Sequence, residues 1–217
     1  MPSKPKSYKA LVKARLASLK QGRPAPVIMH APAYTLEHAR EYPIYGCWID
    51  SLWKEHNLAR VVLARQQSPD TVVLGIFLVD PLCLGVKNAF FRTDIRSKRL
   101  PKLLLELCGD PDPCPVAFAH QLIYSAVEYA HRYGIEPHPD YTESSLVLDP
   151  PGTHPSNADI EFGKDGKPYF ISGPDDDVDQ IMAKLRRTAG DGNFDFLAGF
   201  GQPDFEEFED EIDNEIE

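Results

Sequence analysis

The chain has 217 residues, 42% of them hydrophobic, which suffices for the core of an ordinary domain and excludes an intrinsically disordered protein. The sequence has no apolar run of about 18 residues, and no short apolar segment follows its basic start. We therefore expect a cytoplasmic protein with neither a transmembrane segment nor a secretory signal. The net charge of −10 at pH 7 argues against a broad nucleic-acid-binding surface.

The two ends of the chain carry opposite charge. Residues 1–23 contain seven Lys or Arg and no acid, and over 7–21 the apolar side chains recur on one helical stripe, which predicts a basic amphipathic helix. Such a helix either docks on its own domain or binds an anionic partner, whether RNA, a membrane surface or an acidic protein. Residues 204–217 contain nine acids and no base, and their apolar residues are three and four apart. This acidic tail is either solvated and disordered or a partner-binding segment.

Residues 24–203 are expected to form a single domain, with a candidate soft boundary in the Pro-rich segment 148–157. Three apolar segments near its start, at 44–49, 58–66 and 71–79, are enriched in β-branched and aromatic residues and are joined by short polar connections. This pattern predicts an antiparallel β-meander. The third segment is apolar on both faces, so we expect a central strand that is covered on both sides.

The stretch "GIFLVDPLCLGVKNAFF", residues 75–91, takes the third segment into a loop. Asp80 stands where a rigid strand meets that loop, which is a common place for a catalytic group, and Cys83 follows it. Structural explanations compete with this one. Asp80 precedes Pro81 and can simply end the strand, while the apolar neighbours of Cys83 favour an inert thiol.

The block "FLVDPLCLGVKNAFF", followed about thirty residues later by a long helical pattern and "GIEPHPDY", resembles an uncharacterised bacterial protein family with an LVDxxCLGVK block. The resemblance spans about residues 43–147. It implies one inherited domain and brings no known activity with it.

Residues 96–109 predict a short helix, and residues 116–134 predict the longest and most regular one. The last third predicts a β-hairpin over 158–172, a helix over 173–192 and a final strand near 193–200. Strands and helices do not alternate strictly, so the expected fold class is α+β: an antiparallel β-meander packed with a long central helix, plus a C-terminal β-hairpin and helix.

Ionisable side chains border the apolar stripe of the long helix. Glu128 and His131 lie three residues apart, and the chain then turns so that His138 and Asp140 come near the same helix end. Two imidazoles and two carboxylates suit a metal ion or a general acid–base pair. His120 borders the same stripe but lies about 16 Å of helix rise from His131, too far to share one ion. A structural explanation also fits, with bordering histidines bonded to neighbours and Asp140 capping the next helix.

Two short matches are similar to a metal-dependent nuclease core of the PD-(D/E)xK type: "PD" at 139–140 and "DIEFGK" at 159–164. That core needs an acid and a lysine two residues apart on one face of a strand. Glu161 and Lys164 are three apart, so the match fails unless Gly163 makes a bulge.

The four cysteines (Cys47, Cys83, Cys108, Cys114) have no CxxC spacing. In a chain of this size they are expected to be reduced and mostly buried, with a redox or zinc pair as the alternative.

No catalytic motif outweighs its structural explanation, so the preferred hypothesis is an accessory or adaptor protein and not an enzyme. It would bind a protein partner through its charged ends, the basic helix 7–21 and the acidic tail 204–217, and it would need no cofactor. Nucleic acid would bind only through the basic helix.

The alternative hypothesis is a metal-dependent hydrolase, acting on a phosphodiester as a phosphodiesterase or nuclease. A divalent zinc, iron or manganese ion would then be held by His131 and His138. The catalytic groups would be Asp80, Glu128 and Asp140.

Overall fold

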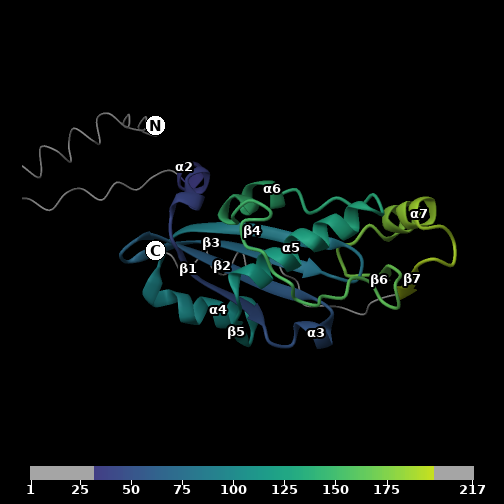
Figure 1. The fold of residues 1–217 in the computed structure, drawn as a ribbon, viewed down its shortest axis with the longest axis horizontal. Coiled ribbons are helices and arrows are strands. Elements are labelled where there is room, and N and C mark those ends of the chain that lie inside the picture. Colours follow the sequence, from purple (N-terminus) through teal and green to yellow (C-terminus); the bar gives the residue numbers. More distant parts are fainter. Residues whose placement is uncertain (1–31, 198–217) are drawn as a thin grey trace, which may run out of the picture.

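A computed structural model of the protein describes residues 32–197, and their side chains from Thr35 onwards. The predicted basic helix 7–21 and acidic tail 204–217 lie outside the described residues. The fold is α+β, as predicted: helices pack on a five-stranded antiparallel sheet, and a small two-stranded parallel sheet lies at one end (Figure 1).

The large sheet has the strand order β4-β3-β2-β1-β5, and all its neighbours are antiparallel. Its strands are β1 (Ile44–Asp50), β2 (Ala59–Ser68), β3 (Thr71–Asp80), β4 (Gly85–Arg96) and β5 (Pro111–Pro113). The predicted meander is therefore confirmed as β1 to β3. Strands β4 and β5 were not predicted from the sequence.

Strand β4 was not predicted because its polar residues interrupt the alternation of apolar and polar side chains that is typical of a strand. Its pairing with β3 shifts register twice, and Asp94 has a positive φ of 59°. The Gln67 side chain stabilises this irregular part of β4, since it accepts a hydrogen bond from the Asp94 N–H at 3.0 Å and donates one to the Asp94 carboxylate at 2.8 Å.

Strand β3 is an inner strand that is covered on both faces, as predicted, and every residue from Val72 to Asp80 is buried. Its side chains alternate between two cores: Val73 and Phe77 pack on the face that α5 covers, while Leu74 and Ile76 pack on the face that α4 covers. The helices on the two faces are α5 (Val116–His131) with α6 (Tyr141–Ser144), and α4 (Leu100–Cys108).

The long helix α5 matches its prediction, and its apolar stripe fills the first core with Ala119, Leu122, Ile123 and Ala126. The shorter helices are α2 (Pro32–Glu37), α3 (Trp53–His56) and three 3-10 turns, η1 (Ala39–Glu41), η2 (Ser97–Arg99) and η3 (Ser145–Val147).

The C-terminal unit consists of β6 (Tyr169–Ile171), α7 (Val178–Thr188) and β7 (Asp195–Leu197), with β6 and β7 parallel. It packs on the corner between β3 and β4, where Phe170 and Leu185 join Cys83 and Leu84 in a third core. Figure 1 places it at one end of the large sheet. Asp177 caps α7 by accepting the Gln180 N–H at 3.0 Å.

Only the turn of the predicted hairpin over 158–172 forms, because the arm before the turn is irregular and the arm after it, β6, pairs with β7. Asp165 and Gly166 have positive φ and lie inside a single antiparallel bridge between Lys164 and Lys167. The arm before the turn does not form a strand because its backbone groups hydrogen-bond elsewhere. The Gln121 side chain bonds to both the N–H and the carbonyl of Ala158, and the Gly163 N–H donates to Pro81 O at 3.0 Å. Within residues 32–197, no helix combines the length and hydropathy needed to span a membrane.

Candidate functional site

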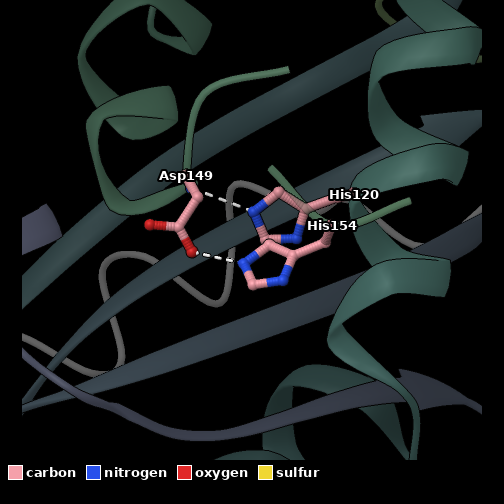
Figure 2. Close-up of side chains that lie close together, drawn as sticks. All are labelled: His120, Asp149 and His154. Atoms are coloured by element: carbon pink, nitrogen blue, oxygen red, sulfur yellow. Dashed lines mark hydrogen bonds and ion pairs between the residues drawn. The ribbon is translucent and has the colours of Figure 1, made fainter. Parts of the chain in front are cut away.

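The described chain gathers two histidines and an aspartate at the side of α5 (Figure 2). Asp149 accepts a hydrogen bond from His154 Nε2 at 2.6 Å, and its backbone N–H donates to His120 Nε2 at 2.9 Å. The two imidazole rings lie 4.8 Å apart, centroid to centroid. Tyr124 completes the cluster by donating to Asp149 O at 2.7 Å.

The hydrogen bonds of His120 fix its protonation state. Its Nδ1 lies 2.8 Å from Val116 O, a carbonyl that can only accept, so Nδ1 carries the proton and Nε2 accepts from Asp149. Burial is the largest influence on His120 and lowers its pKa, against a smaller opposite effect of the bond to Val116. The ring is therefore neutral at physiological pH.

Arg65 lies beneath Asp149 and is only 2% exposed. It comes from β2 and donates from Nε to Val147 O at 2.6 Å and from Nη1 to Tyr42 O at 2.9 Å, while Nη2 forms an ion pair with Asp149 Oδ1 at 2.7 Å. Burial opposes ionisation of Asp149, but the hydrogen bonds and charges of His154 and Arg65 outweigh it and lower the pKa of this carboxyl.

This donor set is poorly arranged for a metal ion. Among residues 35–197, His120, Asp149 and His154 form the one group of three whose ligand atoms lie within 4.8 Å of one another. Both nitrogens of His120 are already bonded to backbone groups, however, and the Arg65 guanidinium neutralises Asp149. An ion bound to His120 Nε2 would leave the partly buried N–H of Asp149 without its acceptor and would lie near the Arg65 cation, both of which cost free energy.

Among residues 35–197, the four residues of the predicted site form no group of three whose ligand atoms lie within 4.8 Å of one another. His131 Nε2 pairs with Glu136 at 2.9 Å, and His138 Nδ1 lies 3.9 Å from the carboxylate of Asp140. The Glu128 side chain is 76% exposed and lies 3.9 Å from Arg132, the residue after the end of α5. None of the four predicted residues belongs to the ligand group described above, so their catalytic and metal roles stay predictions.

Asp140 does precede α6, as the structural explanation proposed, although its side chain makes no capping hydrogen bond to that helix.

Asp80, the remaining predicted catalytic residue, ends β3 and is 6% exposed. Its carboxylate accepts the backbone N–H groups of Leu82, Cys83 and Leu84 at 2.8, 3.1 and 3.2 Å. Burial raises its pKa to about 6, against the attraction of Lys87 and these three hydrogen bonds. The carboxylate thus holds the β3–β4 corner together, and a catalytic role stays a prediction.

A cleft of about 580 Å³ opens beside this corner. Pro81 and Leu82 line it together with Trp53, Asp159 and Glu161. The acids of the nuclease-like match therefore do reach a cleft, but they lie on an irregular segment and not on a strand. The geometry that such a nuclease core needs from one strand face is absent from residues 158–163.

Another hollow, of about 390 Å³, is a mainly apolar groove lined by residues of α4, β1 and β5. We call it the α4 groove. It is lined by Tyr45, Trp48, Ser97, Leu100, Pro101, Leu104, Leu105 and Pro111.

The helical pattern singles out His120 but does not predict its partners Asp149 and His154. Asp149 and His154 lie in the Pro-rich segment 148–157, the candidate soft boundary, and Asp149 bonds there to His120 of α5 and to Arg65 of β2. One signal was present: Arg65 interrupts an apolar strand pattern at a buried position, and a buried guanidinium needs a carboxylate or carbonyl partner.

Comparison with protein-family models, with curated proteins and with solved structures finds no match to this chain.

Proposed function

We propose that this protein is an adaptor or accessory protein that binds an acidic amphipathic segment of a protein partner in the α4 groove. The proposal keeps the adaptor role expected from the sequence but moves the contact from the charged ends, the basic helix 7–21 and the acidic tail 204–217, to the α4 groove. The observation that carries it is the apolar, cation-flanked surface of this groove.

The apolar character of the groove supports a docking function. Five large hydrophobic side chains are exposed among residues 35–197, and two of them, Tyr45 at 44% and Leu105 at 56%, line the α4 groove. Trp48 and Pro111 extend the same surface over β1 and β5. Contiguous exposed apolar patches with polar edges are typical of protein-binding sites, and grooves of this kind accept the apolar face of a helix.

The charge beside the groove favours an acidic occupant. Residues 96–102, "RSKRLPK", contain four cations and no acid, and they lead into the N-terminus of α4, where the helix dipole also favours negative charge. Arg96 and Lys98 are exposed at this edge. The chain's own residues 204–217 have the composition that such a site would select, with apolar residues three and four apart among nine acids.

The test uses a fluorescein-labelled peptide with the sequence of residues 204–217, titrated with the full-length protein and followed by fluorescence anisotropy. We expect saturable binding that weakens as salt is raised, because the charges beside the groove are exposed. Leu105→Glu should raise Kd by about tenfold or more, since it places a charge in the apolar contact. The matched control is Leu52→Glu, at an exposed leucine outside the groove (41% exposed), which should leave Kd unchanged.

A second full-length variant distinguishes a partner from the chain's own tail. In it, Phe205, Phe208, Ile212 and Ile216 are replaced by Ser, so that the tail can no longer compete. Tighter peptide binding by this variant would mean that the tail occupies the groove in the free protein. Absence of binding in both proteins, or equal effects of the two leucine substitutions, would overturn the proposal.

The alternative, a metal-dependent hydrolase acting on a phosphodiester, has less support because the one candidate ligand group found within residues 35–197 is internally bonded. Elemental mass spectrometry of the purified protein discriminates between the two functions. Near-stoichiometric zinc, iron or manganese that is lost in His138→Ala or His154→Ala would favour the hydrolase, and the two variants would show which site holds the ion.

A further inference from the structure

Two cysteines that are far apart in the sequence face each other across the edge of the large sheet. The Sγ atoms of Cys47 and Cys114 lie 3.4 Å apart. Cys47 is in β1, and Cys114 directly follows β5, with its backbone N–H donating to Cys47 O at 3.0 Å. The register that pairs Trp48 with Pro113 therefore continues by one residue to this pair.

The position of the pair allows a disulfide to form without rearrangement of the sheet. Facing residues on antiparallel neighbours have Cα atoms about 4.5 to 5.5 Å apart, within the range of about 4.4 to 6.8 Å that a disulfide spans. An S–S bond is about 2.05 Å long, so the sulfurs need to approach by only about 1.4 Å. Small rotations of the two side chains suffice for that.

The same two sulfurs differ in a way that suits stepwise oxidation. Cys114 is partly exposed, whereas Cys47 is buried at 5% exposure. The hydrogen bond between the thiols lowers the pKa of Cys114 and raises that of Cys47. Cys114 is thus the more accessible and more acidic thiol, which is the pattern of a cysteine that reacts first.

The other two cysteines provide an internal contrast. Cys83 is fully buried and Cys108 is 2% exposed. Burial raises the pKa of both thiols, that of Cys108 to about 12. Neither is an accessible thiolate at neutral pH.

We propose that Cys47 and Cys114 are a modification site, a thiol pair that hydrogen peroxide oxidises to a reversible disulfide. The Cys114 thiolate attacks one peroxide oxygen and the O–O bond breaks, which gives a sulfenic acid and, after protonation, one water. The Cys47 sulfur then attacks the sulfenic sulfur, the S–S bond forms, and the hydroxyl leaves as a second water. Two thiols lose two electrons and two protons in total, and one peroxide is reduced to two waters.

The product joins β1 to β5, the two strands that contribute Trp48 and Pro111 to the α4 groove. The pair is separated by 67 positions in the sequence, so the bond closes a long loop and should raise the thermal unfolding midpoint by several degrees. A dithiol reductant should break the Cys47–Cys114 bond and return the unfolding midpoint to its original value.

The test treats the fully reduced full-length protein with one equivalent of hydrogen peroxide, blocks remaining thiols with iodoacetamide under denaturing conditions, and maps peptides without reduction. We expect two of the four thiols to disappear, a peptide linked through Cys47 and Cys114, and full recovery of thiols with dithiothreitol. Cys114→Ser and Cys47→Ala should each abolish the linked peptide, whereas the matched control Cys108→Ser should retain it.

Linkage of Cys108 to Cys114, a disulfide between two molecules, or no linkage at a dose that oxidises a free cysteine peptide would each overturn the inference. A linked peptide that forms only in the unfolded protein would also overturn it, because the proposal requires the folded β1–β5 register. Since the mapping of the unsubstituted protein decides the question, a variant that fails to fold does not remove the test.

Discussion

At the scale of single residues, His120 shows how a buried titratable group sets the pH response of the fold. Both of its ring nitrogens are bonded to the backbone, at Val116 O and Asp149 N, and its pKa is lowered mainly by burial. In the unfolded chain a histidine has a pKa of about 6.5. The unfolded state therefore binds a proton before the folded state does, and the stability that His120 supplies above about pH 6.5 is lost as the pH falls.

We predict that His120→Gln lowers the free energy of unfolding at pH 7.5, because Gln cannot make both backbone hydrogen bonds in this geometry. The loss should be of the order of 1 to 3 kcal/mol at pH 7.5. It should be clearly smaller at pH 5, because protonation of the histidine in the unfolded state has by then removed part of the stability that neutral His120 supplies. Urea denaturation at the two pH values measures both numbers. An equal loss at pH 5 and pH 7.5 would mean that His120 does not titrate with folding.

Asp80 is expected to respond in the opposite direction. Its folded pKa of about 6 lies above its ordinary value, so the folded state holds this proton more tightly than the unfolded state does. The stability present at low pH is then lost as the pH rises from about 4 to about 6, by about 3 kcal/mol for a shift of this size.

Asp80→Asn removes that titration while keeping an oxygen that can accept two of the three corner N–H groups. The free energy of unfolding of the unsubstituted protein, minus that of the variant, should therefore fall between pH 4 and pH 7. Urea titrations at half-unit pH steps measure this difference. A difference that rises over the same range would show that the backbone N–H groups hold the carboxylate ionised throughout.

Residue-scale prediction from the sequence succeeded where chemistry is local and failed where it depends on distant partners. That Asp80 would end a strand follows from the proline after it. The pairing of Arg65 with Asp149 spans more than eighty positions and follows from the way β2 passes beneath the segment after α6. Neither residue type nor spacing encodes that approach.

At the scale of elements, two adjacent leucines of α4 have different roles: Leu104 stabilises the fold, and Leu105 is proposed to contact the partner. Leu104 is 5% exposed and packs into the core beneath the sheet, whereas Leu105 is 56% exposed beside the groove. Leu104→Ala should lower the free energy of unfolding by about 2 to 4 kcal/mol, through lost burial and the remaining cavity. Leu105→Ala should change it by less than about 0.5 kcal/mol.

Thermal or urea denaturation of the two variants checks this contrast. Similar destabilisation by both would mean that Leu105 is covered by part of the chain in solution, and the α4 groove would then be closed in the free protein.

The elements with a strong period were predictable, and those with irregular pairing were not. Helices α5 and α7 repeat their apolar residues every 3.6 positions, and β1 to β3 are apolar runs rich in β-branched and aromatic residues between short polar connections, so local sequence suffices. Strand β4 depends on the Gln67–Asp94 bonds and two register shifts, and β5 is three residues long with a proline at each end. Such strands exist because a neighbouring edge is available.

At the scale of the whole molecule, a sheet covered on both faces leaves His120 and Asp80 buried. Helix α5 lies on one face and contributes His120 to a cluster whose Asp149 and His154 stay partly exposed, and the C-terminal unit packs on the corner at Asp80. Helix α4 covers the other face only in part and leaves apolar residues of α4, β1 and β5 exposed. This uneven coverage is why we assign the partner-binding surface to the α4 groove.

The most direct test of partner binding in the α4 groove uses the two tryptophans of the chain, since Trp48 lines the groove and Trp53 lines the cleft beside Asp80. In Trp53→Phe, where Trp48 is the sole tryptophan, an unlabelled peptide of residues 204–217 should shift the emission to shorter wavelength and saturate, as apolar contact replaces water. In Trp48→Phe the emission of Trp53 should not change. A shift in the second variant without one in the first would place the partner elsewhere and contradict the proposed function.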